Sequence, residues 1–541
     1  MTASDDSKLV MNTGTANGGD AGVAGGTVRV GLSEDGFTGR VDFPERAGTG
    51  FLSINGNDYT VIDSLGAQDS ATGTDLQGME NDLAGHYALG SDIDASDTAG
   101  WEDGKGFAPV GSAGFTGTFD GLGHTIGKLT IDRPDQMFVG LFRGLGGDAA
   151  LRNVGLAGGS VTGKEWVGGL LGSDSWGKLI RIGNVFSTAK VTGENYVGGL
   201  AGSIGTQETG ALALNNAWAG GEVFGAGNAV GGLAGSISAY GGSITVDNAW
   251  AVGNVTGNDR VGGLVGVAEL SGDDVHDESH VSISKVSASG KVTGTDQVGG
   301  LIGRSEGMGA DVSISDARAT GSVTGNGDVG GLVGYSVVRN DGTSSLSRAR
   351  ATGDVTGNYN VGGLVGQNES FGGNATASID KAHATGAVTG TSGAVGGLVG
   401  KSHAWTGDAT VSITNAYATG SVTTGSLFVG GLVGCANRTA ISNAYATGAV
   451  RGVNFAGGLV GYAVEDVDVS ASFWDTQSTG QTSSSGGGTG MTTAEMKTLA
   501  NFSSATEANG NVDPAWDISA NGGEPRVWRI YEGDTAPLLR D

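Results

Sequence analysis

Short runs of alternating aliphatic and polar residues, separated by glycine, follow one another along most of this chain. The clearest copy reads Ile413-Thr-Asn-Ala-Tyr-Ala-Thr-Gly-Ser-Val-Thr and continues, after a short link, into Val429-Gly-Gly-Leu-Val-Gly. This second phrase recurs ten times with small variations, at spacings of 27 to 37 residues, beginning at Val167, Val197, Val230, Val261, Val298, Val329, Val361, Val395, Val429 and Ala456. A period of this length is typical of a solenoid of stacked coils.

The spacing within each repeat shows which part of the coil is fixed. An aliphatic residue such as Ile413 lies 15 or 16 residues before each phrase, whereas the interval from a phrase to the next such residue ranges from 12 to 22. One corner of the coil therefore accepts the insertions. Three short β-prone runs separated by glycine turns suit a parallel β-helix, in which each run pairs with its equivalent one coil away. We predict an all-β β-solenoid of about ten coils of about 32 residues.

One variable position lies between the two alanines of each repeat, and it is our main candidate for ligand binding. Because side chains alternate across a strand, and because Trp, Arg and His share this position, we expect it to face solvent and the alanines to face inward. Aromatic faces can stack on sugar rings, and Arg and His can donate hydrogen bonds. The alternative is that like side chains stack only to stabilise the solenoid. The candidate glycan-binding residues are Phe186, Trp218, Trp250, Arg318, Arg350, His383, Tyr417 and Tyr445.

The flanks of the repeats predict capping elements at both ends. Residues 1–60 are strand-rich and are expected to continue a solenoid, residues 61–137 form a flanking block with a short helix near Leu76 and Met79, and residues 138–470 are the repeats. Residues 471–541 contain a loop, a short helix opened by the capping-box pattern at Thr492–Glu495, and an aromatic cap. The first residues lack the regions of a secretion signal, so we expect any export signal to lie outside this chain.

Composition and charge narrow the class of partner. The chain holds 107 glycines and 16% charged residues, and its net charge of −27 argues against nucleic acid or an anionic bilayer as a direct partner. Nowhere do 18 apolar residues run together, so no direct membrane insertion is expected. The single cysteine, Cys435, excludes an intrachain disulfide framework.

Three further patterns could carry chemistry. The longest insertion contains weak candidates for the ligands of a divalent ion such as calcium, although a solvated charged loop explains the insertion as well. The candidates are Asp273, Asp274, His276, Asp277, Glu278 and His280. Asp120 and His124 suggest acid–base catalysis of the kind performed by β-helical polysaccharide lyases and epimerases, but such sites need several carboxylates and cations on one face, and these two residues lie in a block that looks structural. Two threonine columns, one including Thr320 and the other Thr324, suggest an ice-binding solenoid, although a glycine corner separates them.

The repeat as a whole resembles the GLUG motif of large bacterial surface proteins. The blocks beginning at Asp82-Leu-Ala-Gly-His-Tyr and Val527-Trp-Arg-Ile-Tyr extend the resemblance to segments of filamentous-haemagglutinin-type exoproteins over roughly residues 50–541. The resemblance implies a right-handed parallel β-helix that is secreted or displayed on the bacterial surface and is exported by an outer-membrane partner. It implies a role in adhesion, in biofilm cohesion or as a stalk, and no catalytic residues; glycans or host and bacterial cell-surface molecules are the partners we expect. The motif also accompanies IgA-cleaving metallopeptidases, but no histidine here begins the His-Glu-x-x-His pattern of their zinc site.

These observations together favour a non-enzymatic adhesin or stalk segment, used in adhesion or biofilm cohesion, with no cofactor other than possible calcium. A β-helical enzyme that acts on polysaccharide is the alternative, followed by an ice-binding solenoid.

Overall fold

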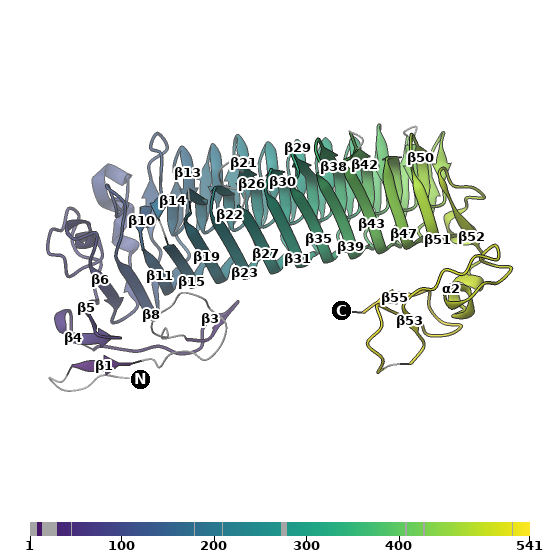
Figure 1. Ribbon diagram of the computed structural model, residues 1–541. Helices are drawn as coiled ribbons and strands as arrows, with labels where there is room; N and C mark the ends of the chain where they lie inside the picture. Colours follow the sequence, from purple (N-terminus) through teal and green to yellow (C-terminus); the bar gives the residue numbers. More distant parts are fainter. Residues whose placement is uncertain are drawn as a thin grey trace. The chain divides into compact units, whose positions relative to one another are not determined.

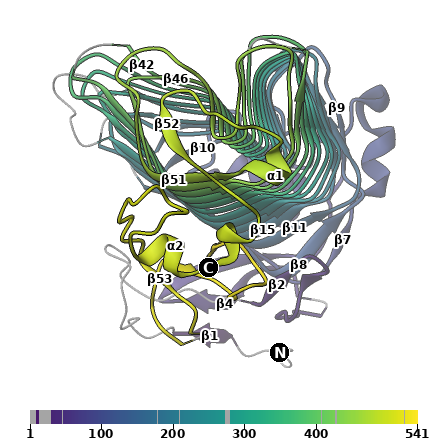
Figure 2. The same cartoon turned by 90° about the vertical axis from the view of Figure 1, so that its right-hand side faces the viewer.

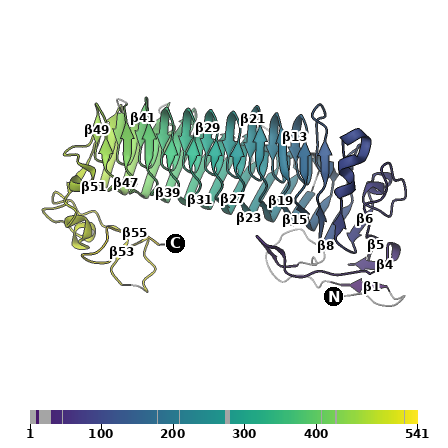
Figure 3. The same cartoon turned by 180° about the vertical axis from the view of Figure 1, so that it is seen from behind.

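The computed structural model describes residues 8–12, 30–44, 46–177, 179–207, 209–271, 279–405, 408–425, 428–521 and 523–540. The chain divides into two compact units, the first holding residues 1–226 and 232–253 and the second holding residues 227–231 and 254–541. Its strands form a parallel β-solenoid of about twelve turns of about 32 residues, seen from opposite sides in Figures 1 and 3. The predicted fold class is therefore confirmed.

Each complete coil contains one long strand and three short ones, where the sequence pattern predicted three runs. In the coil with the clearest repeat these are β43 (Thr410–Ala418), β44 (Val422–Thr424), β45 (Phe428–Gly430) and β46 (Val433–Asn437). The extra strand arises because the Val-Gly-Gly-Leu-Val-Gly phrase contains a corner: β45 ends at its first glycine and β46 begins at its second valine. We call the sheet of long strands the long-strand sheet.

The first unit contains an N-terminal segment and the first coils of the solenoid. Its long strands pair in parallel register with their neighbours. They are β8 (Thr118–Gly127), β11 (Ala150–Ala157), β15 (Leu179–Ser187), β19 (Ala211–Ala219) and β23 (Ser243–Ala251). The short strands are β9 (Thr130–Asp132), β10 (Phe142–Gly147), β12 (Ser160–Thr162), β13 (Glu165–Gly168), β14 (Leu171–Gly177), β16 (Lys190–Gly193), β17 (Asn195–Gly198), β18 (Ala201–Gln207), β20 (Val223–Gly225) and β22 (Ala234–Tyr240).

The second unit continues the same pattern. Its long strands are β27 (His280–Ala288), β31 (Asp311–Ala319), β35 (Thr343–Ala351), β39 (Thr376–Ala384), β43, β47 (Thr439–Ala446) and β51 (Asp468–Asp475). Its short strands, besides β44–β46, are β21 (Asn228–Gly231), β24 (Val255–Thr256), β25 (Asp259–Gly262), β26 (Val265–Ser271), β28 (Val292–Thr293), β29 (Asp296–Gly299), β30 (Ile302–Met308), β32 (Val323–Thr324), β33 (Gly327–Gly330), β34 (Val333–Arg339), β36 (Val355–Thr356), β37 (Tyr359–Gly362), β38 (Val365–Phe371), β40 (Val388–Gly390), β41 (Ala394–Gly396), β42 (Val399–Ala404), β48 (Val450–Arg451), β49 (Ala456–Gly457) and β50 (Val460–Ala463).

The paired glycines are required by close backbone packing, within the corner for the first and between coils for the second. A Cβ on Gly330 would lie 1.9 Å from the carbonyl oxygen of Val333, and a Cβ on Gly331 would lie 2.0 Å from that of Gly363. Neither glycine has a positive φ; the left-handed residue of this corner is instead the one before the valine, such as Asp328 at φ 48°. The glycines therefore admit a neighbouring backbone, and a non-glycine residue makes the turn.

The long strands do not alternate strictly, because each one from β11 onward contains one residue in the left-handed conformation. In β43 this residue is Asn415, at φ 48°, so that Ile413, Ala416 and Ala418 all face the core and are completely buried. The predicted inward orientation of the alanines is confirmed. In the first unit the equivalent asparagines form a ladder, with the Nδ2 atoms of Asn216 and Asn248 donating to the Oδ1 atoms of Asn184 and Asn216 at 2.5 and 2.9 Å.

The segments at the two chain ends differ from the coils. The N-terminal segment holds β1 (Leu9–Met11), β2 (Leu32–Ser33), β3 (Gly36–Phe37), β4 (Gly48–Ile54), β5 (Asn57–Ile62), β6 (His86–Leu89), β7 (Ile93–Asp94) and the 3₁₀ helices η1 (Gln77–Asn81) and η2 (Ser96–Gly104). Within it β4 and β5 form an antiparallel hairpin instead of a further coil. The number of turns exceeds ten because β8 and β9 of the flanking block, together with β10, also form a rung.

The C-terminal segment holds α1 (Thr476–Thr479), β52 (Gly487–Met491), η3 (Glu495–Lys497), α2 (Ala500–Ser503), β53 (Ile518–Ser519), β54 (Trp528–Arg529) and β55 (Leu538–Leu539). The stretch expected as a loop thus includes α1 and β52, and β52 pairs with β51. The capping box at Thr492 forms as predicted: the backbone N–H of Thr492 donates to Glu495 Oε2 at 2.7 Å, and that of Glu495 donates to Thr492 Oγ1 at 3.3 Å.

Candidate binding face on the long-strand sheet

The variable position between the alanines points away from the core in both units, and we call this series of residues the outward column. In the first unit Phe186, Trp218 and Trp250 occupy paired positions on β15, β19 and β23. Their rings stack, with centroids 5.1 Å apart at 11° for the first pair and 6.3 Å apart at 6° for the second. The predicted column therefore exists as a ladder of parallel rings.

Part of the N-terminal segment covers the beginning of this ladder. The ring of Phe37 lies 5.4 Å from that of Phe186, and Phe186 and Trp218 are each only 4% exposed. The prediction of solvent exposure is wrong for these two residues, because residues 30–44 fold back over the long-strand sheet. Trp250 is half-buried.

A cavity of about 610 Å³ lies where this segment crosses the sheet. Phe186 and Trp218 contribute to its wall together with residues 34–40, Asp92, Gly123, Thr125, Ala157 and Thr188. Glu34 and Asp35 are exposed at its edge. Ring edges, hydroxyl groups and carboxylates in one hollow are the combination that binds small polar ligands such as sugars.

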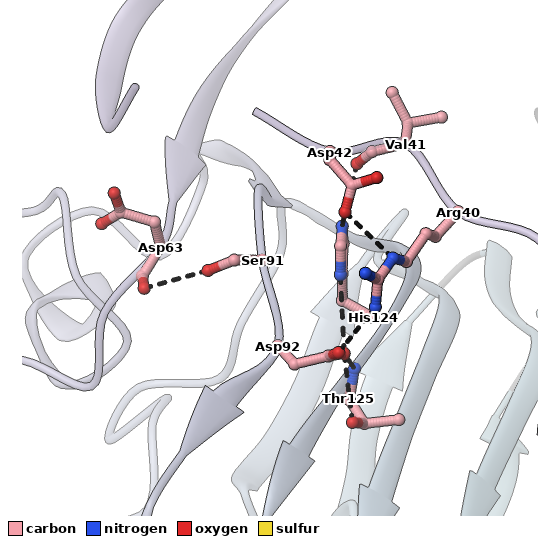
Figure 4. Close-up of polar contacts among 8 residues, drawn as sticks. All are labelled: Arg40, Val41, Asp42, Asp63, Ser91, Asp92, His124 and Thr125. Carbon is pink, nitrogen blue, oxygen red and sulfur yellow. Dashed lines mark hydrogen bonds and ion pairs between the residues drawn. The ribbon is translucent and has the colours of Figure 1, made fainter. Parts of the chain in front are cut away.

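His124 holds the covering segment in place, as Figure 4 shows. Its Nε2 lies 2.9 Å from the carbonyl oxygen of Val41, and its Nδ1 lies 3.5 Å from Asp92 Oδ1. Arg40 forms ion pairs of 2.9 Å with both Asp42 and Asp92. The His124 side chain is completely buried, so these contacts hold residues 40–42 against the first rung of the solenoid.

The candidate acid–base pair does not form an open site. Asp120 is completely buried, and its carboxylate accepts hydrogen bonds from Arg152 Nε at 2.7 Å, Asn153 Nδ2 at 2.8 Å and the Leu122 N–H at 3.0 Å. A buried carboxylate whose oxygens accept three hydrogen bonds from the protein has a structural role.

In the second unit the outward column changes from cations to aromatic rings. Arg318 is exposed, and Arg350 and His383 are half-buried. They occupy successive paired positions on β31, β35 and β39. The ring of His383 then stacks on Tyr417 at 4.7 Å and 3°, and Tyr417 stacks on Tyr445 at 5.1 Å and 7°.

The C-terminal segment covers the aromatic end of this column. Tyr417 and Tyr445 are only 7% and 1% exposed, Trp528 packs 6.1 Å from both rings, and the Tyr445 hydroxyl donates to the carbonyl of Pro537 at 2.6 Å. Burial raises the pKa of Tyr445 well above its usual value. The predicted exposure is wrong here too. Figure 2 shows α2 and β53 beside the long strand β51, and a hydrogen bond of 2.9 Å from Trp516 Nε1 to Ala471 O joins the two.

The stacking changes what the outward column can do. A ring between two parallel neighbours has both faces covered, so its faces are not available to a sugar, and only edges and polar groups remain. Ring stacking therefore supports the structural interpretation of Phe186, Trp218, Tyr417 and Tyr445. The groups that a ligand can still reach are those of the cavity wall and the cationic side chains of the outward column.

The possible calcium ligands are only partly visible. Asp273, Asp274, His276, Asp277 and Glu278 lie outside the described residues, and His280 is the exposed first residue of β27. Among the described residues no three His, Cys, Asp or Glu side chains are grouped so as to hold a metal ion. Calcium binding stays a prediction.

Two stacks of aromatic side chains were missed by the sequence analysis. In the first unit, Phe138, Trp166 and Tyr196 stack at 4.8 and 5.2 Å, all with φ between 53° and 59°. They occupy the left-handed position before the valine of each phrase, a regular place in the sequence that could have revealed them. In the second unit Trp405, 48% exposed, stacks on Phe371 at 5.2 Å.

Three comparisons relate this chain to known proteins. A family model described as the GLUG motif matches residues 357–389, which is one coil of the solenoid. Halomucin of Haloquadratum walsbyi is 40% identical over 141 residues, which are 24% of this chain and 2% of halomucin. This chain therefore spans a very small part of that relative's length.

A solved structure described as a "putative immunoglobulin A1 protease from Bacteroides ovatus" shares 22% identity, with 49% of this chain and 75% of that chain covered. Its TM-score of 0.33 is too low for the likeness to bear on fold or function here. Among the described residues, no helix has the length and apolar character needed to cross a membrane. The resemblance to filamentous-haemagglutinin-type exoproteins stays a prediction. What the comparisons establish is that this chain carries the GLUG motif within the repeats of a parallel β-solenoid.

Proposed function

We propose that this chain is a non-enzymatic, secreted or cell-surface segment that binds a glycan in the cavity beneath residues 34–40. The observation that carries the proposal is the lining of that cavity, where carboxylate and hydroxyl groups lie beside the rings of Phe186 and Trp218. Around them stand the hydroxyls of Thr38, Thr125 and Thr188. Hydroxyl and carboxylate groups beside ring edges can bond the hydroxyls of a sugar without a stacking face.

Charge limits the ligand that this cavity can take. Glu34, Asp35 and Asp92 line it, and Arg40 is already paired with Asp92 and Asp42. An acidic sugar would therefore be repelled, and a neutral saccharide fits best.

A secreted or surface location is supported by the similarity to halomucin and by the resemblance of the repeats to the GLUG motif of bacterial surface proteins. Export through an outer-membrane partner, adhesion and biofilm cohesion belong to the same proposal. Surface digestion of intact source cells with a protease tests the location, because a displayed segment is cut and an internal one is not.

A glycan array tests the binding function. The variant Glu34→Ala with Asp35→Ala removes two exposed carboxylates from the cavity edge and should weaken binding at least about tenfold, the cost of losing one charged hydrogen bond. Asp132→Ala with Asp135→Ala removes the same charge from exposed positions outside the cavity lining and is the matched control. Equal binding by the two variants, or no neutral glycan bound by the folded wild-type protein, would refute the proposal.

A further inference from the structure

Five asparagines in this chain stand two residues before a serine or threonine, in the pattern Asn-x-Ser/Thr with no proline between; they are Asn254, Asn368, Asn374, Asn437 and Asn501. In secreted proteins this pattern is the acceptor for N-linked glycans, which attach to the side-chain amide nitrogen. A glycan is bulky and hydrated, so only an asparagine at the surface of the fold can carry one. The burial of each asparagine therefore decides which of the five can be modified.

Three of these asparagines are enclosed by the fold. Asn368, Asn437 and Asn501 are 2%, 8% and 5% exposed. Asn368 lies within β38, the Nδ2 of Asn437 lies 2.9 Å from His403 Nε2, and the Nδ2 of Asn501 donates to the carbonyl oxygen of Glu495 at 2.9 Å. A sugar on any of the three would have to displace close-packed protein, so we expect them to stay unmodified.

Asn374, in contrast, lies at an exposed turn of the second unit. It stands between β38 and β39, at the corner of the coil where the repeats differ in length, and Gly372 and Gly373 turn the chain before it at φ 69° and 57°. Its backbone N–H and its Nδ2 both donate to Asp341 Oδ1, at 2.6 and 3.0 Å. An amide nitrogen carries two hydrogens, so the contact with Asp341 uses one and leaves the other to be replaced by a sugar.

The hydroxyl group that completes this pattern lies beside the same turn. Thr376 is the half-buried first residue of β39, and its Oγ1 donates to the carbonyl oxygen of Asn374 at 3.2 Å. Residues 372–375 lie between the two strands and not within them. A modifying enzyme can therefore reach Asn374 without separating paired strands.

Asn254 is the second exposed asparagine of the set. It stands directly before β24, and its Oδ1 accepts a hydrogen bond from the backbone N–H of Lys291 at 3.0 Å. Thr256, which completes the pattern, is exposed as well. The contact with Lys291 engages the amide oxygen, so a glycosidic bond to the nitrogen leaves it intact.

We propose that Asn374 and Asn254 carry N-linked glycans, added by a transferase from a sugar that is activated by an anomeric phosphate. In this step the bond between the anomeric carbon and the phosphate oxygen breaks, and its electron pair leaves with the phosphate. The anomeric carbon bonds to Nδ2, which loses a proton. The inference rests on the proposed secreted or surface location, because the pattern is an acceptor in secreted proteins. It does not depend on ligand binding in the cavity of the first unit, so each can fail separately.

Peptide mass spectrometry of the protein purified from its source cells tests this inference. The peptides that contain Asn374 and Asn254 should carry the mass of a glycan, and those that contain the three buried asparagines should not. Asn374→Gln and Thr376→Val, each produced in the same cells, should abolish the modification of their peptide. Thr376→Ser keeps the hydroxyl group and should retain it.

The outcomes separate this modification from its alternatives. An unmodified Asn374 or Asn254 overturns the inference for that residue, and equal modification of the buried asparagines overturns the argument from burial. Loss of the glycan in Thr376→Val but not in Asn374→Gln would place the sugar on the threonine and overturn it too. If the segment is released into the medium or is cut by protease on intact cells while both asparagines are unmodified, the glycosylation fails and the location stands. If it is neither released nor cut, the location fails as well.

Discussion

Replacing Trp528 by alanine should release the C-terminal segment from the long-strand sheet. Trp528 is completely buried, its ring lies 6.1 Å from Tyr417 and Tyr445 and 4.7 Å from Trp516, and its Nε1 donates to Asn415. Truncating a buried tryptophan to alanine costs about 3–5 kcal/mol. Because this ring joins the C-terminal segment to the sheet, the lost free energy weakens the contact between them. The population of molecules in which the segment is detached should rise about a hundredfold to several thousandfold.

A smaller change to the same contact provides the matched control. Tyr445→Phe keeps the ring stack but removes the hydroxyl that donates to Pro537, leaving one buried carbonyl without a partner. We expect a cost of about 1–3 kcal/mol, clearly below that of Trp528→Ala.

Amide hydrogen exchange is the appropriate assay for a local change of this kind, because it reports which segment opens, whereas a global unfolding midpoint does not. Peptides from residues 500–540 should lose protection in Trp528→Ala, while those from β31 and β35 keep theirs. Unchanged exchange in the C-terminal peptides would refute the reasoning, and so would an equal loss along the whole solenoid.

Three further changes test other parts of the structure. His124→Ala removes the contact with Val41 O and should cost about 2 kcal/mol, seen as faster exchange in residues 38–43. Gly330→Ala places a Cβ 1.9 Å from a carbonyl oxygen and should cost about 3 kcal/mol in urea unfolding, whereas Gly523→Ala, with open space around it, should cost under about 0.5 kcal/mol. Burial raises the pKa of Asp328 from 3.8 to about 6; because the folded state holds this proton more tightly, stability should fall by up to about 3 kcal/mol as pH rises from about 4 to about 6. Asp328→Asn should remove that fall, and an unchanged pH profile of urea unfolding would contradict the assignment.

The fold could be predicted because its signal is local and repeated. Each coil carries the same glycine corner and the same aliphatic residues, so the period and the inward side of the alanines follow from the sequence. The left-handed residue within each long strand was harder to identify. Asparagine and aspartate favour this conformation, as Asn415 and Asp316 show, but Lys285, Arg348 and Lys381 adopt it in other coils and carry no such preference.

The exposure of the outward column could not be predicted in the same way. Trp218 and Tyr417 occupy equivalent positions in their repeats, and both are buried by segments that lack any repeat. The covering contacts join residues far apart in sequence, such as Phe37 with Phe186 and Trp528 with Tyr417. No periodic pattern encodes contacts of this kind, so they appear only in the folded chain.

The same contacts explain where ligands can reach the solenoid. Inward positions keep small and aliphatic side chains because a close-packed coil interior does not tolerate changes in volume. Outward positions can vary. In the outward column, aromatic rings lie where a terminal segment covers them, as at Phe186 and Tyr445, and cations lie at Arg318 and Arg350. An aromatic ladder left uncovered would expose apolar area, and a buried arginine ladder would lack counter-charges, so residue type and cover have to match. Binding is therefore expected at the edge of a cover, where the cavity lies.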